Sequence, residues 1–210
     1  MWVRGLCGAC NSMAGGRYDR AYADFALALR PWVSGSARRL AAGSEVPAVR
    51  LAPGLVTKSV LYGMHAISPN LRTKFPQLAV DLLAHEQRIR LPVGLRLRVG
   101  LYAHHEARLA GPIHSVRLLG RSEVYGTHAE VYFPPLAWVL SYDDPGMVFD
   151  TEGWASADEW PLYADDVTRT DLRDLTRTFP TVMHPPSRSP LDWIHLYSDE
   201  ITPMLLGSAV

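Results

Sequence analysis

Two cysteines, Cys7 and Cys10, are the residues of this 210-residue chain whose type and spacing point most directly to chemistry. Because two residues separate them, both sulfur atoms can reach a single metal ion. A structural zinc site needs four ligands, so this pair supplies half of one. We therefore expect Cys7 and Cys10 to bind Zn²⁺, with the other ligands coming from elsewhere in the chain or from a second chain related by a two-fold axis.

The sequence leaves two other interpretations of the pair open. A Cys-x-x-Cys sequence also occurs in dithiol redox proteins, but there it follows the first strand of a βαβ unit, and only six residues precede Cys7. Alternatively, the thiols are inert side chains at the start of a helix, since free cysteine often serves as a small core residue. The chain has no further cysteine, which excludes a disulfide-stabilised secreted scaffold.

The residues after Cys10 predict a helix, because apolar side chains recur there at helical spacing. Before and among these apolar residues lie the polar and small residues Asn11, Gly15, Gly16 and Asp19. Over residues 4–28 the string resembles the C-terminal part of the HNH endonuclease fold, a zinc knuckle that runs into a helix (a partial treble clef). The resemblance implies structural Zn²⁺ on Cys7 and Cys10 and DNA as the partner. It also places Asn11 beside a catalytic Mg²⁺ or similar divalent ion and leaves Asp19 with a structural role.

The chain departs from the family upstream of this segment. HNH enzymes carry a first zinc pair and a metal-binding histidine strand there, and one histidine acts as the general base while the metal steadies the leaving oxygen. No residue of this chain occupies those places by sequence. We therefore expect the chain as written not to cleave DNA. Metal-dependent phosphodiester hydrolysis is expected only if an upstream half comes from a longer form of the chain or from another polypeptide.

Composition narrows the class of protein. Hydrophobic residues make up 48% of the chain and charged residues 20%, which excludes intrinsic disorder as a description of the whole. No apolar run approaches the roughly 18 residues of a membrane span, and the N-terminus lacks the apolar stretch of a secretory signal. We therefore expect a cytoplasmic globular protein with no membrane partner.

The net charge of zero hides an uneven distribution. Residues 1–105 contain 14 Lys and Arg against 5 Asp and Glu, whereas residues 106–210 contain 7 against 16. This asymmetry is typical of a first half that binds a polyanion such as DNA. It is equally typical of two halves that pack together and neutralise each other.

Hydrophobic periodicity predicts helices first and an antiparallel sheet later, which is an α+β fold. We expect a helix over residues 13–29, capped by Asn11 or Ser12 and ended by Pro31. The other expected elements are a short strand at 46–51, helices at 56–67 and 76–83, strands at 95–99, 114–119, 128–133 and 136–142, and a short helix at 171–176.

These elements divide the chain into a zinc-knuckle segment (1–31), a connector (32–54) and an α+β domain of unassigned role (55–210). A different class of function follows if the last part works alone as a non-catalytic domain that binds a protein partner. In that case removal of residues 1–31 leaves fold and binding intact.

Other groups are weaker candidates for a site. His104, His105 and Glu106 resemble a metal cluster, but neighbours on a strand point to opposite faces. If they lie instead in a turn after residues 101–103, one histidine could complete the zinc site of Cys7 and Cys10. Acid pairs in turns are expected to be solvated rather than to bind Mg²⁺, and tryptophans to anchor the core or a partner surface. The residues concerned are Asp143-Asp144, Asp158-Glu159, Asp165-Asp166, Trp138, Trp154, Trp160 and Trp193. We expect His65 to be a hydrogen-bonded core or boundary residue and His184 to lie in a loop.

Overall fold

Helices and an antiparallel sheet make up the computed structural model, which describes residues 7–34, 49–101, 108–110, 113–114, 126–133, 136–142, 154–166, 168–170, 196–197 and 200–201. Its helices are α1 (Gly8–Ala14), the π-helical segment η1 (Gly15–Asp19), α2 (Arg20–Ser34), α4 (Pro53–Ile67), α5 (Pro69–Lys74), α6 (Pro76–Leu83) and the 3₁₀-helix η2 (Trp160–Leu162). Its strands are β1 (Val49–Leu51), β2 (Leu95–Leu101), β3 (Arg108–Ala110), β4 (Ile113–His114), β5 (Gly126–Phe133), β6 (Leu136–Tyr142), β7 (Ala155–Ser156), β8 (Thr168–Thr170), β9 (Leu196–Tyr197) and β10 (Glu200–Ile201). The predicted α+β fold, helices first and strands later, is confirmed.

The main sheet has the strand order β3–β5–β6–β2–β7, with β4 also paired to β5, and every pairing is antiparallel. The strands predicted at 95–99, 128–133 and 136–142 are therefore confirmed. Of the strand predicted at 114–119, His114 lies in β4 and the rest falls outside the described residues, as does the helix predicted at 171–176. Two short ladders, β1 with β8 and β9 with β10, complete the described pairings.

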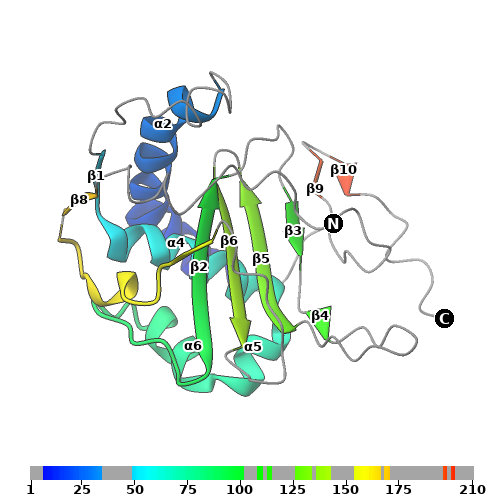
Figure 1. Ribbon diagram of the computed structural model, residues 1–210. Helices are drawn as coiled ribbons and strands as arrows, with labels where there is room; N and C mark the ends of the chain where they lie inside the picture. Colours follow the sequence, from blue (N-terminus) through cyan, green and yellow to red (C-terminus); the bar gives the residue numbers. More distant parts are fainter. Residues whose placement is uncertain are drawn as a thin grey trace, which may run out of the picture.

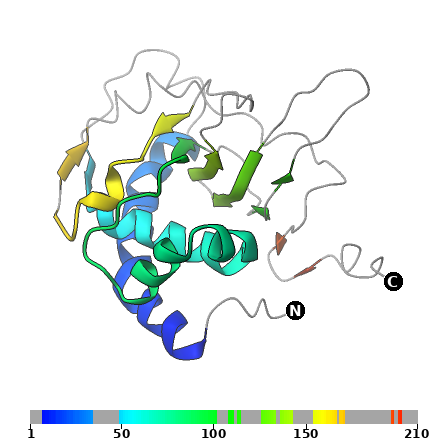
Figure 2. The ribbon, with the colours of Figure 1, turned by 90° about the horizontal axis from the view of Figure 1, so that it is seen from below.

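The helices cover one face of this sheet, as the two views in Figure 1 and Figure 2 show. Leu95, Leu97 and Val99 alternate along β2 and are almost fully buried in the shared core. On the neighbouring strand β6, Trp138 and Leu140 lie opposite Val99 and Leu97 and enter the same core. The period-two pattern of the sequence thus places one row of side chains against the helical layer.

Helix α4 lies in the middle of the helical layer and buries an apolar stripe at three- and four-residue spacing. The stripe consists of Val56, Val60, Leu61 and Met64. The helix begins at Pro53 rather than at the predicted residue 56, because proline suits the first helical position. Helix α6 has its predicted bounds for the same reason at Pro76. Helix α5 was not predicted, although the Ser68 side chain caps it by accepting a hydrogen bond from the Leu71 N–H.

The N-terminal helix departs from its prediction at both ends. It begins at Gly8 with Cys7 as the N-cap, so Asn11 and Ser12 lie inside it and cap nothing. It also continues past Pro31, because α2 extends to Ser34. Proline has no N–H to donate to the carbonyl of Leu27, four residues earlier, so the helix continues without that hydrogen bond.

Gly15 and Gly16 begin a distinct segment, since residues 15–19 are π-helical and join α1 to α2. Tyr18 in this segment and Phe25 in α2 are buried in the same core as the sheet. The N-terminal helix therefore packs on the rest of the described structure. None of the helices in the described ranges is long and apolar enough to cross a membrane.

Candidate functional site

The thiols of Cys7 and Cys10 converge at the first turn of α1. Their sulfur atoms lie 2.8 Å apart, and the backbone N–H of Cys10 donates to Cys7 Sγ over 3.2 Å. A disulfide would bring the sulfurs to about 2.05 Å, so both residues are free thiols. Cys7 is exposed and Cys10 is partly exposed, which leaves the pair open to solvent.

The contact between the thiols makes the two groups unequal. The hydrogen bond with Cys10 lowers the pKa of Cys7 below its usual value, and nearby backbone N–H groups act in the same direction. The same contact raises the pKa of Cys10, and desolvation and the charge of Cys7 act in the same direction. Cys7 is therefore the sulfur that becomes a thiolate first, and thiolate is the form that binds metal or attacks a disulfide.

The other two polar residues of the HNH-like string lie apart from each other. Asn11 is exposed directly after Cys10, and its backbone N–H donates to the Cys7 carbonyl over 2.9 Å. Asp19 accepts a hydrogen bond of 2.6 Å from the Ser59 hydroxyl, which ties η1 to α4. The geometry gives Asp19 a structural contact and leaves the Asn11 side chain in solvent.

Tyr18 of η1, Tyr62 of α4 and His85 form a polar cluster. The hydroxyls of Tyr18 and Tyr62 lie 3.3 and 3.1 Å from His85 Nδ1, and Tyr62 also donates to the carbonyl of Leu82. His85 has a φ of 58°, a left-handed conformation that is uncommon for a residue other than glycine. Burial raises the pKa of Tyr62 to about 12, with smaller contributions from Tyr18 and Cys10. No spacing pattern in the sequence signals this cluster, because its members are far apart along the chain.

The donor set at the cysteine pair fits half of a zinc site, since two thiols point at one position. Within the described part of the chain, no third His, Cys, Asp or Glu joins them to make a group that could hold a metal ion. The candidates His104, His105 and Glu106 lie outside the described residues. Any remaining zinc ligands must therefore come from elsewhere.

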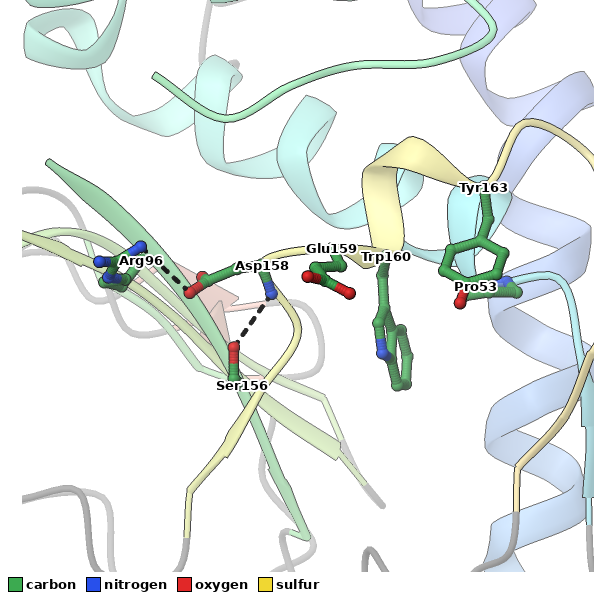
Figure 3. A pocket seen from close by; sticks show the side chains of 7 residues that line it. All are labelled: Pro53, Arg96, Ser156, Asp158, Glu159, Trp160 and Tyr163. Atoms are coloured by element: carbon green, nitrogen blue, oxygen red, sulfur yellow. Dashed lines mark hydrogen bonds and ion pairs between the residues drawn. The ribbon is translucent and has the colours of Figure 1, made fainter. Parts of the chain in front are cut away.

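A pocket of about 570 Å³ opens beside the start of α4 (Figure 3). Its lining residues are Pro53, Arg96, Ser156, Asp158, Glu159, Trp160 and Tyr163. Asp158 lies in a turn as predicted, but its carboxylate is not simply solvated: Oδ1 accepts from the Leu97 N–H over 2.6 Å and Oδ2 lies 3.6 Å from Arg96 Nη1. Trp160 also lines this pocket, together with Arg96 from the distant strand β2.

Contacts across the chain account for part of the charge asymmetry. Arg96 pairs with Asp158, and Arg88 Nη2 lies 3.8 Å from Asp166 Oδ2. Both pairs join a cation of residues 1–105 to an acid of residues 106–210. They favour the interpretation in which the two halves neutralise each other, and Asp166 is the ion-pair partner of Arg88.

The remaining predicted residues fall mostly in the core. Trp138 is fully buried, and Trp160 packs edge-on against it with ring centroids 5.8 Å apart, which confirms the anchoring role predicted for these tryptophans. His65 is buried, but neither ring nitrogen bonds to a described residue, so the prediction of a hydrogen-bonded histidine is wrong there. Asp143-Asp144, His184 and Trp193 lie outside the described residues.

Comparisons with known proteins found no match to the chain among protein-family models, curated proteins or solved structures.

Proposed function

We propose that the chain is a zinc-binding, DNA-associated protein related to HNH endonucleases, in which Cys7 and Cys10 supply two of four zinc ligands. The observation that carries this proposal is the convergence of two free thiols at the exposed first turn of a long helix. Two thiolates on tetrahedral zinc lie about 3.8 Å apart, given Zn–S bonds of about 2.3 Å. The sulfurs need to separate by about 1 Å from their present distance, which a small change of either side-chain torsion provides.

The other two ligands come from residues outside the described ranges, from a longer form of the chain or from a second copy of it. Zinc at this position would fix the start of α1 and the exposed Asn11 beside it. With an upstream half present, Asn11 would help to hold a Mg²⁺ ion, and that ion would supply charge neutralisation at the phosphodiester. The general base belongs to the upstream half, so we expect no cleavage from the chain alone.

Exposed cations on the same helix support the DNA part of the proposal. Arg17 and Arg20 follow the thiols within η1 and α2, and both are exposed. Arginine suits contacts with phosphate because its planar guanidinium donates two parallel hydrogen bonds. If the arginines contact phosphates, the affinity for DNA should fall steeply as the salt concentration rises.

Zinc content is the direct test. We expect one zinc per chain, or one per two chains if the site closes across a two-fold axis, and none in the double variant Cys7→Ser/Cys10→Ser. Ser12→Ala is the matched control on the same exposed turn and keeps the metal. Gel filtration with and without chelator separates the two stoichiometries, because only the shared site dissociates to monomers when zinc is removed.

Nuclease assays with Mg²⁺ test the enzymatic part, with the present chain and with a form extended upstream. Cleavage by the extended form alone is the expected result. If neither form cleaves DNA and neither contains zinc, the proposal is wrong.

The inequality of the two thiols favours a second candidate, a dithiol redox protein. Cys7 is the exposed sulfur with the lowered pKa, as expected of an attacking cysteine, and Cys10 is close enough to resolve a mixed disulfide. Oxidation of both thiols forms one S–S bond and transfers two electrons and two protons to a disulfide acceptor, which becomes a dithiol. Titration against glutathione buffers tests this candidate, since a reversible two-electron transition without bound zinc supports it over the first.

A further inference from the structure

The pocket at the start of α4 is built from residues that the proposed function does not use. It lies where β2, β7 and η2 meet the first turn of α4, so three distant segments of the chain form its walls. Its volume of about 570 Å³ lies in the range of sites for small organic ligands, about 300–1,000 Å³. The pocket is therefore large enough for an organic group with its flanking atoms.

Two different walls face each other across the pocket, as Figure 3 shows. One wall is aromatic and apolar, with the rings of Trp160 and Tyr163 beside Pro53. The opposite wall is polar and carries Arg96 and Asp158. The carboxylate of Glu159 lies between the two walls. A ligand in the pocket would thus meet π-faces on one side and a carboxylate above.

The charges of the polar wall largely cancel. The Arg96 guanidinium pairs with Asp158, whose other oxygen accepts the Leu97 N–H. Glu159 is exposed, and within the described ranges its carboxylate has no hydrogen bond or ion pair. Among the described lining residues, Glu159 is therefore left with an uncompensated negative charge.

The nearby N-terminus of α4 does not turn the pocket into an anion site. A Cβ atom built on Gly54 would lie 1.5 Å from the Tyr163 carbonyl oxygen and 2.4 Å from that of Ala164. These two oxygens therefore lie directly against the first turn of the helix, where a bound anion would have to sit. Carbonyl oxygens repel anions, so the helix terminus adds no attraction for phosphate or carboxylate.

We propose that this pocket binds a guanidinium or ammonium group, held by the Glu159 carboxylate and by the ring faces of Trp160 and Tyr163. A cation over an aromatic face is attracted by the ring quadrupole, and a hydrogen-bonded carboxylate strengthens the contact. A guanidinium is the better fit because it is flat, stacks on rings and donates to both carboxylate oxygens. The cation belongs either to a free small molecule or to an arginine side chain of a peptide.

The test uses N-acetyl-L-arginine amide as a peptide-like probe, agmatine as a small free cation, and N-acetyl-L-citrulline amide as the neutral counterpart. Binding is followed by NMR shifts of the tryptophan indole N–H signals. We expect the arginine probe to bind and the citrulline compound to bind about tenfold more weakly or not at all. Tighter binding of agmatine identifies a free small molecule as the source, and tighter binding of the arginine amide identifies a peptide.

Two variants locate the binding. Glu159→Gln keeps the shape of an exposed side chain and removes its charge, and we expect it to weaken binding of the arginine probe about tenfold. Tyr163→Leu removes one ring face and should weaken it about three- to fivefold. Asp24→Asn is the matched control, because it also removes one exposed carboxylate but lies on α2 outside the pocket lining. Equal binding of arginine and citrulline compounds, or undiminished binding by Glu159→Gln, overturns the proposal.

Discussion

Helices α1 and α4 both begin next to a candidate site, but their first turns are held in place by different contacts. At α1 the two thiols and the N–H that bonds to one of them lie within four residues, and the turn is open to solvent. At α4 the turn is buried at Gly54 against the carbonyls of Tyr163 and Ala164, more than 100 residues later in the chain. The first site therefore depends on local helix geometry, and the second depends on the tertiary fold.

The largest expected effect tests the long-range contact at α4. Gly54→Ala places a Cβ atom 1.5 Å from a backbone oxygen, so the helix or the segment at 163–164 must move. We expect the free energy of unfolding to fall by about 4 kcal/mol or more, measured by chemical denaturation.

Gly63→Ala is the matched control on the same helix, because nothing lies within 4 Å of the added atom. It should raise stability by about 0.5–1 kcal/mol, since alanine is the better helix former. Equal effects of the two alanines would show that the α4 turn is not held by the later segment.

A second, smaller effect tests how the N-terminal helix is anchored beyond its open first turn. Phe25 is 1% exposed and packs edge-on against Trp160, whereas Leu27 is 60% exposed. Phe25→Ala should cost about 3 kcal/mol, and Leu27→Ala less than about 0.5 kcal/mol. A large loss of stability in Phe25→Ala would also count against the hypothesis that the rest of the chain folds independently of residues 1–31. That hypothesis predicts little loss for either variant.

The third prediction concerns the pH dependence of α4. Burial lowers the pKa of His65, and the nearby Arg72 guanidinium lowers it further. The folded state therefore binds this proton less readily than the unfolded chain, whose histidine pKa is about 6.5. Stability is fully present above pH 6.5 and is lost as pH falls from there toward the lower folded pKa.

Denaturation curves of wild type and His65→Met between pH 8 and pH 5 measure this loss. The variant should lose less stability on acidification, although His85, whose pKa is lowered mainly by burial, still contributes in the same direction. Identical pH profiles would mean that His65 gains its proton without penalty in the folded state.

The smallest expected effect concerns the open turn of α1. In metal-free, reducing buffer, Cys7→Ser/Cys10→Ser should change the free energy of unfolding by less than about 0.5 kcal/mol, because both thiols face solvent. With zinc bound, the wild type alone should become less stable when chelator is added. A large loss in the metal-free variant would show that the thiols support the fold directly.

Sequence reasoning succeeded where one period or one local signal decides the structure. The alternation of Leu95, Leu97 and Val99 predicted β2, and proline at the first position marked the start of α6. It failed at the N-terminal helix, because a cysteine sulfur took the capping role and the helix continues past Pro31. The convergence of the two thiols could be predicted because it depends only on the local spacing of Cys7 and Cys10.

The pocket and the Tyr18–Tyr62–His85 cluster could not be found in the same way. Each depends on segments that meet only through the sheet register or the packing of helices, and no spacing in the chain encodes those meetings. Asp158 illustrates the difference. The residues around it predict a turn, but its partners, Arg96 and the Leu97 N–H, lie on a strand about sixty residues earlier.

The π-helical stretch η1 also sets the angular phase of the dithiol. Each residue of an α-helix advances about 100° around the axis, so one extra residue in a turn rotates everything before it by that angle. Cys7 and Cys10 are thus turned by about a quarter of a circle from where an uninterrupted helix anchored at Phe25 would point them. A shortening by one residue at Gly16 would restore the regular winding and leave both sulfurs on the side that they face now, because the shorter regular helix spans the same total rotation.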